Sequence, residues 1–145
     1  MFDAFNISSS GMTAQRLRMD IIADNIANAD TTRTSDGSTY RRKIPIFQAK
    51  EELSFKKRLK ATLGESAGGQ GVKVINISED QSPFKLIFNP GHPDANEDGY
   101  VTMPNVNIVT EMVDMIDAAR AFEANITALN TYKSMAMKAI EIGRG

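Results

Sequence analysis

The stretch 94–99 (DANEDG) is the part of the sequence that most resembles a metal-binding motif. It matches the first six positions of an EF-hand calcium loop, with oxygen-bearing side chains at positions 1, 3 and 5 and glycine at position 6. The twelfth position is Asn105, where that loop needs a bidentate glutamate. The flanking residues are typical of a turn and a strand, so the sequence predicts a polar turn that binds no metal.

The other residues that could do chemistry lack the partners that catalysis requires. His92 is the only histidine, which excludes a multi-histidine metal site, and no serine or aspartate is placed to form a triad with it. The glycine-rich run 68–71 lacks the lysine and the Ser/Thr of a P-loop. Asp114 and Asp117 lie one helical turn apart, but we expect solvent-facing or inter-subunit charges there. We predict no catalytic residue, no cofactor, no metal and no enzymatic activity.

Two short basic clusters, 41–43 (RRK) and 56–60 (KKRLK), could contact phosphates, with Tyr40 and Phe55 available for stacking. Acidic residues are interspersed, and the formal net charge of the chain is -1. A solvated surface or salt bridges to a partner subunit therefore explain the clusters better. A small nucleic-acid-binding protein remains an alternative.

Composition restricts the protein class further. With 145 residues, 41% of them hydrophobic and 24% charged, the chain fits one soluble domain of ordinary size. It has no cysteine, which excludes disulfides and thiolate chemistry. No uncharged apolar run approaches the roughly 20 residues that span a bilayer, so we expect no membrane insertion. Residues 1–12 have neither a basic nor an apolar signal region, so we expect no cleaved signal peptide.

The spacing of apolar residues divides the chain into three segments. Residues 3–29 follow a helical pattern that 30–32 (DTT) end. Residues 31–104 hold all five prolines and read as a small β-rich insert with a flexible loop at 60–71. Within this insert the apolar stretches predict four strands, at 43–47, 72–77, 84–88 and 100–103.

The third segment, 107–142, carries the strongest pattern. The spacing between successive apolar residues alternates between four and three positions over more than four heptads, and Lys133 is the single polar member of this series. Asn107 is a plausible N-cap and Gly143 a plausible stop. The chain is therefore expected to be α+β and mainly α: residues 3–29 and 107–142 form an antiparallel coiled-coil-like domain, and the β-rich insert lies outside it.

Neighbouring subunits are the natural cover for these helices. Fixing a helix backbone costs about 1–2 kcal/mol per residue, so one helix pair alone would be marginal. Alternatively, the insert folds back over the helices, or the heptads serve a cytoplasmic coiled-coil adaptor. We expect the assembly interface to consist of the apolar positions of both helices, namely Met12, Met19, Ile22, Ile26, Ile108, Met112, Met115, Ala119, Phe122, Ile126, Leu129, Ala136 and Ile140.

Residues 10–20 (SGMTAQRLRMD) and 25–32 (NIANADTT) closely resemble the N-terminal signature of flagellar rod and hook proteins. Asp30, where that signature has a second asparagine, is more typical of the proximal rod subunits. Segments 89–95 (NPGHPDA) and 103–107 (MPNVN) are similar to the same subunits. The positions that we assign to the family motif are Ser10, Gly11, Gln15, Asn25, Asn28, Pro104 and Asn105.

The resemblance implies a structural subunit of the flagellar basal-body proximal rod. Such subunits assemble with themselves and with other rod proteins into a helical tube in the periplasm, which transmits torque and encloses the export channel. The resemblance also implies contact with the rotor-ring/rod adaptor, and passage through the flagellar type III export apparatus without signal cleavage. The terminal helices of such subunits tend to be disordered before assembly.

Overall fold

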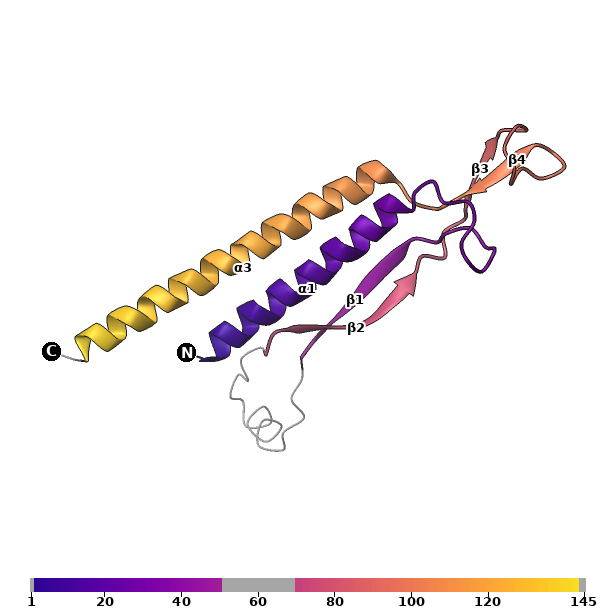
Figure 1. Ribbon diagram of the computed structural model, residues 1–145. Coiled ribbons are helices and arrows are strands. Elements are labelled where there is room, and N and C mark those ends of the chain that lie inside the picture. The colour runs from indigo at the N-terminus through magenta and orange to yellow at the C-terminus, as the bar shows by residue number, and fades with distance from the viewer. Residues whose placement is uncertain (1, 51–69, 144–145) are drawn as a thin grey trace, which may run out of the picture. The chain divides into compact units, whose positions relative to one another are not determined.

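The computed structural model describes residues 2–50 and 70–143 (Figure 1). The α+β, mainly α fold is confirmed: two long terminal helices pack together, with short antiparallel strands between them in the sequence. The basic cluster 56–60 and most of the expected loop at 60–71 lie outside the described residues. The elements in chain order are α1 (Phe2–Ala27), β1 (Lys43–Ala49), β2 (Val72–Glu79), β3 (Lys85–Phe88), β4 (Tyr100–Met103) and α3 (Ile108–Ile142).

The chain forms two compact units, each with parts of both helices. Of the described residues, the first unit comprises 2–16, 47–50, 70–75 and 119–143. The second comprises Leu17–Ile46 and Asn76–Ala118. The expected division into a helical domain (3–29 plus 107–142) and a β-rich insert (31–104) stays a prediction.

In each unit a part of α1 lies antiparallel to a part of α3 (Figure 1). In the second unit, the side of α3 turned inward carries Glu111 and Ala118, which are seven residues apart and fully buried. Ala118 has a small side chain, which lets the helix backbones approach closely. The apolar seam residue Met112 is 55% exposed, so the inward side is offset from the seam.

Both sheets are two-stranded and antiparallel. In the first sheet, the Lys50 amide donates to the Gly71 carbonyl near one end and the Asp80 amide donates to the Arg42 carbonyl near the other. In the second, Lys85 pairs with Met103 and Phe88 with Tyr100. The four observed strands overlap the four predicted ones, and the differences are confined to their ends.

The start of α3 matches the sequence expectation. Asn107 Oδ1 accepts hydrogen bonds from the amides of Val109 (3.1 Å) and Thr110 (3.4 Å), which makes Asn107 the N-cap. The last helical residue of α3 is Ile142, directly before Gly143. Helix α1 ends at Ala27, two residues before the expected end.

The interior of the second unit combines apolar and polar side chains. Ala29, Tyr40 and Val106 form a buried cluster. The largest fully buried side chains of the described residues are Glu111, Val101, Asn25 and Pro104, so two of these four are polar. Buried polar groups need partners, and those partners define the candidate site.

Candidate assembly site

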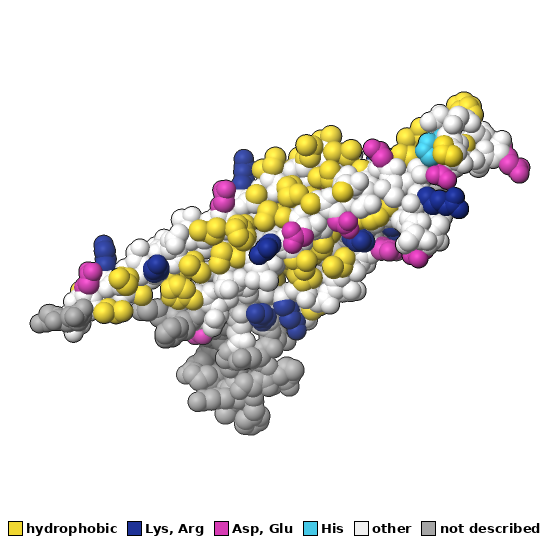
Figure 2. All heavy atoms as spheres, in the orientation of Figure 1, with side chains coloured by type: hydrophobic (Ala, Val, Ile, Leu, Met, Phe, Trp, Pro, Cys, Tyr) yellow, Lys and Arg dark blue, Asp and Glu magenta, His cyan; other side chains and the backbone are white. Residues whose placement is uncertain are grey.

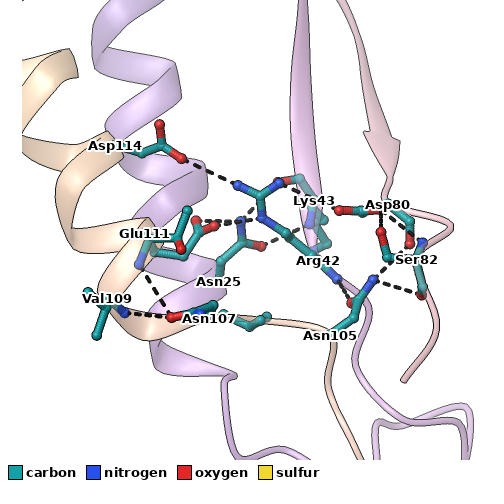
Figure 3. A network of polar contacts seen from close by, with 12 residues as sticks. Asn25, Arg42, Lys43, Asp80, Ser82, Asn105, Asn107, Val109, Glu111 and Asp114 are labelled. Carbon is teal, nitrogen blue, oxygen red and sulfur yellow. Dashed lines mark hydrogen bonds and ion pairs between the residues drawn. The ribbon is translucent and has the colours of Figure 1, made fainter. Parts of the chain in front are cut away.

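Asn25 joins three elements of the second unit (Figure 3). Its Nδ2 donates to the Lys43 carbonyl (2.9 Å) and to Glu111 Oε2 (3.0 Å). Its Oδ1 accepts from the Lys43 amide (2.9 Å) and from the Tyr40 hydroxyl (3.0 Å). An asparagine amide has two donors and two acceptor positions, so Asn25 uses its whole hydrogen-bonding capacity. It thereby ties α1 to the start of β1 and to α3.

Glu111 is the buried charge of this polar cluster. Its Oε1 accepts a 2.6 Å hydrogen bond from Arg42 Nε, so the carboxylate is paired as well as buried. The Arg42 guanidinium also lies 3.6 Å from Asp80 and 3.4 Å from Asp114. Burial acts to lower the pKa of Arg42, but the hydrogen bond and charge of Glu111, together with the charges of Asp80 and Asp114, outweigh it and the pKa is raised. A guanidinium is therefore fixed at the centre of three carboxylates.

Asn105 closes the cluster on the side of the loop after β2 (Figure 3). Its Oδ1 accepts from the Arg42 amide at 2.8 Å, and its Nδ2 donates to the carbonyls of Asp80 (3.0 Å) and Ser82 (3.2 Å). Hydrogen bonds from the hydroxyl and amide of Ser82 lower the pKa of Asp80. The buried Pro104 precedes Asn105 and has no amide hydrogen that would need a partner.

The interpretation of the first basic cluster as a solvated or inter-subunit surface is wrong for Arg42, which is largely buried and paired within the chain, whereas the pair of Lys43 with Asp24 is solvent-exposed. Arg42 is paired as described, and Lys43 Nζ lies 2.9 Å from Asp24. Arg41 donates to the carbonyls of Asp80 and Ser82 and lies 4.2 Å above the Phe84 ring centroid. These partners are distant in sequence, so composition could not reveal them.

The same correction applies to Asp114. It lies 3.0 Å from Arg18 and 3.4 Å from Arg42 within the chain, so its charge is compensated by two residues of its own chain. Asp117, in contrast, is exposed as expected.

In the first unit, family-motif residues mediate close contacts of α1. Ser10 Oγ donates to the Ile7 carbonyl (2.7 Å) and accepts from the Val72 amide (3.1 Å), which ties β2 to α1. Gly11 faces α3: a Cβ built on it would lie 2.9 Å from Asn125 Oδ1. The buried Gln15 Oε1 has no hydrogen-bond partner among the described residues.

The EF-hand-like stretch is occupied with contacts inside the chain. Asp94 accepts a hydrogen bond from the Thr32 hydroxyl (2.8 Å) and lies 3.8 Å from Arg33. Asn96 Oδ1 accepts from the Tyr100 amide, and His92 Nδ1 accepts from the Asp94 amide. Across residues 2–50 and 70–143, no group of three acidic or histidine side chains is arranged to hold a metal ion.

The outward side of α3 is apolar over its first three turns. Hydrophobic side chains gather over this part of the helix (Figure 2), and Val109 is 71% exposed. We call this surface the α3 apolar face; it consists of Ile108, Val109, Met112, Val113 and Ile116. No described helix is both long and apolar enough to cross a membrane. Contiguous exposed apolar patches of this kind mark interaction sites.

The structure distributes the predicted interface residues over different environments. Ile108, Met112, Ile126 and Ile140 are exposed, and Ile22 is buried. The remaining positions are half-buried: Met12, Met19, Ile26, Met115, Ala119, Phe122, Leu129 and Ala136.

Two sequence families match the ends of the chain. Residues 5–33 match the flagella basal body rod protein family, and residues 97–142 match the C-terminal family of the flagellar basal body rod FlgEFG proteins. Three relatives named flagellar basal-body rod protein FlgC match nearly the full length. The Bacillus subtilis protein is 47% identical over 99% of this chain and 98% of its own. The Borreliella burgdorferi protein is 47% identical over 100% and 99%, and the Salmonella typhimurium protein 41% over 99% and 98%. The chain belongs to the FlgC family of flagellar basal-body rod proteins.

Membership in the FlgC family confirms the resemblance seen in the sequence. The chain is a structural subunit of the basal-body rod and not an enzyme. The adaptor and nucleic-acid alternatives have no support in these matches.

The polar cluster combines residues that the family motif indicated with residues that sequence reasoning missed. The motif residues Asn25 and Asn105 occupy its centre, while Asn28 stays local, donating to Asp24 and accepting from Thr31. Glu111 and Arg42 were missed as partners. One available signal was the position of Glu111, a carboxylate in the first turn of the last helix, directly before the apolar Met112 and Val113.

Proposed function

We propose that this FlgC-family subunit joins the rod by packing the α3 apolar face against neighbouring rod subunits. The exposure of five large apolar side chains at the start of α3 carries this proposal. At about 25 cal/mol per Å² of apolar surface buried, covering such a face provides an effective driving force for assembly. The polar cluster behind it holds the helix in place, so the face is presented on a fixed support.

The finer role that we propose is that of a proximal rod subunit. It assembles with itself and other rod proteins into a helical tubular shaft that transmits torque and encloses the export channel. The rotor-ring/rod adaptor and the flagellar export apparatus are its further partners, and the subunit reaches the periplasm without signal cleavage. The motif at 25–32 with Asp30, together with the names of the full-length relatives, supports this assignment.

The predicted interface residues divide between two roles in this proposal. The exposed members Ile108, Met112, Ile126 and Ile140 meet neighbouring subunits. Buried Ile22 and the half-buried members hold α1 against α3 within each unit.

Met112→Asp tests the proposal in the native host. Because Met112 is exposed, the purified variant is expected to unfold within about 0.5 kcal/mol of the parent. Motility and the amount of the chain in isolated basal bodies are expected to be lost, since assembly would bury an unpaired carboxylate. Ser35→Asp, at an exposed polar position outside both helices, is the control and is expected to swim normally. Normal swimming of Met112→Asp would show that this face lies outside the assembly contacts.

A further inference from the structure

The hairpin formed by β3 and β4 has a second uncovered apolar face. Cross-strand partners share a face, so Leu86 and Phe88 lie on the same side as Thr102 and Tyr100. Leu86 is 66% exposed and Phe88 63% exposed, whereas Val101 on the opposite side is buried. The Phe88 and Tyr100 rings meet edge to face with centroids 5.3 Å apart, which gives this face a fixed shape. An isolated two-stranded hairpin is marginal in water, so this exposed side is suited to contact with another surface.

The α3 apolar face continues into a positive charge. An α-helix turns by about 100° per residue, so the directions of four side chains around the axis of α3 fall within about 60° of one another. These four residues, which we call the α3 stripe, are Val109, Val113, Ile116 and Arg120. They lie nearly opposite Glu111 and Ala118. Arg120 is exposed, and among the described residues no ion pair involves it. From Val109 to Arg120 the stripe is roughly 16 Å long.

The hairpin carries negative charges next to its apolar face, where the α3 stripe carries a positive charge. Beside its apolar face, the turn that leads into Tyr100 carries Glu97 and Asp98. Both are exposed, and neither takes part in an ion pair among the described residues. The hairpin thus presents an apolar patch with an adjacent negative end, and α3 presents an apolar stripe that ends at Arg120.

We propose that the hairpin face of one copy docks on the α3 stripe of a second copy, with Glu97 and Asp98 next to Arg120. The hairpin and the first turns of α3 belong to one folded unit in which both surfaces stay exposed, so the occupant comes from another chain. A contact between two different patches is heterologous and, where it does not close into a ring, generates a helical filament. This inference rests on the proposed function and adds the identity of the surface that covers α3.

The absence of native cysteine makes cross-linking a clean test. In the native host, Leu86→Cys combined with Val113→Cys replaces the parent chain, and isolated basal bodies are treated with a short bismaleimide. The expected product has about twice the 15.9 kDa mass of the chain. Leu86→Cys with Thr127→Cys is the matched control: Thr127 is exposed on the same side of α3 but roughly 21 Å further along, so no such product is expected.

Three outcomes would overturn the docking proposal: no product in rods that contain the variant, equal product in the control, or a product whose mass identifies a different protein. Each of these leaves the chain in the rod, and hence the proposed function intact. Absence of the parent chain from isolated basal bodies would instead contradict the proposed function itself.

Charge reversal decides the matter if the cysteine variants fail to assemble. Arg120→Glu alone, and Glu97→Lys with Asp98→Lys alone, are each expected to lower the rod-bound amount of the chain about fivefold, as for an exposed charge pair. The combination of all three changes is expected to restore it to within about twofold. Failure of the combination to recover any of the loss would overturn the pairing of these two surfaces.

Discussion

At the scale of single residues, Asn25 is the most constrained side chain of the polar cluster. Asn25→Asp keeps the shape of the side chain but replaces its Nδ2 donor with an oxygen. That oxygen would face Glu111 Oε2 and the Lys43 carbonyl, both of which are acceptors. We expect a loss of about 2–4 kcal/mol in the free energy of unfolding at pH 7, measured by urea denaturation.

A second substitution checks the cause of this loss. Glu111→Gln in the Asn25→Asp background supplies an amide donor to the new carboxylate and is expected to recover part of the stability. Asn130→Asp, at an exposed position of α3, is expected to change stability by less than about 0.5 kcal/mol. Full additivity of the two substitutions at 25 and 111 would contradict a direct contact.

Tyr40 gives the cluster a dependence on alkaline pH. Burial raises the pKa of Tyr40, and the neighbouring Asp24 carboxylate raises it further. The folded chain therefore favours the protonated phenol, and this contribution to stability is complete below the unfolded pKa of about 10 and lost as pH rises above it. We expect Tyr40→Phe to lower stability by about 1 kcal/mol at pH 7, because the hydrogen bond to Asn25 is lost.

Stability curves between pH 7 and pH 12 test this assignment. The parent is expected to lose stability above pH 10 more steeply than Tyr40→Phe. Tyr132→Phe, at an exposed tyrosine, should retain the parental slope. Identical slopes for the parent and Tyr40→Phe would exclude Tyr40 as the group responsible.

At the scale of elements, Gly71 decides how the start of β2 meets α1. Its φ of +93° is unfavourable for a residue with a side chain, and a Cβ built there would overlap Ser10 Oγ. Gly37 has a similar φ of +79° but open space around it. Gly37→Ala is expected to cost about 1–2 kcal/mol from the backbone alone, and Gly71→Ala at least about 1 kcal/mol more. Thermal unfolding of both variants measures the difference, and equal costs would mean that Ser10 moves aside freely.

The elements themselves could be predicted because their signals are local. Heptad spacing marks both helices, Asn107 caps its own helix, and turn residues bound the strands. The polar cluster could not be predicted from such signals. Glu111 meets Arg42 across 69 positions and Asn25 across 86, and no periodicity encodes such pairs. The family motif indicated Asn25 and Asn105 but not the residues that they bind.

The inward side of α3 was also beyond prediction from periodicity. The apolar seam is continuous, yet the helix turns Glu111 and Ala118 toward the interior of the second unit. The small Ala118 allows close packing, and Glu111 finds two donors there, so its burial is compensated. The heptad seam includes neither position, so it does not identify the inward side.

At the scale of the whole molecule, burial is uneven along α3. Glu111 and Ala118 are buried, whereas almost every residue from Asn130 to Gly143 is exposed. We expect amide hydrogen exchange in the free chain to be slowest near residues 111–118 and faster toward Ile142, since helices without tertiary packing are marginal. In isolated rods this gradient should largely disappear. Strong, even protection of both helices in the free chain would show that the helices are complete without neighbours.

The polar cluster has a mechanical consequence for a rod subunit. A purely apolar contact between α1 and α3 would let the two helices slide past each other in small axial steps, because flexible side chains can exchange neighbours one at a time. Asn25, Glu111 and Arg42 instead fix one axial register, since a slip of one turn, about 5.4 Å, would strand a buried charge. The contact therefore resists axial load until its hydrogen bonds break together. It fails in one cooperative step instead of lengthening gradually.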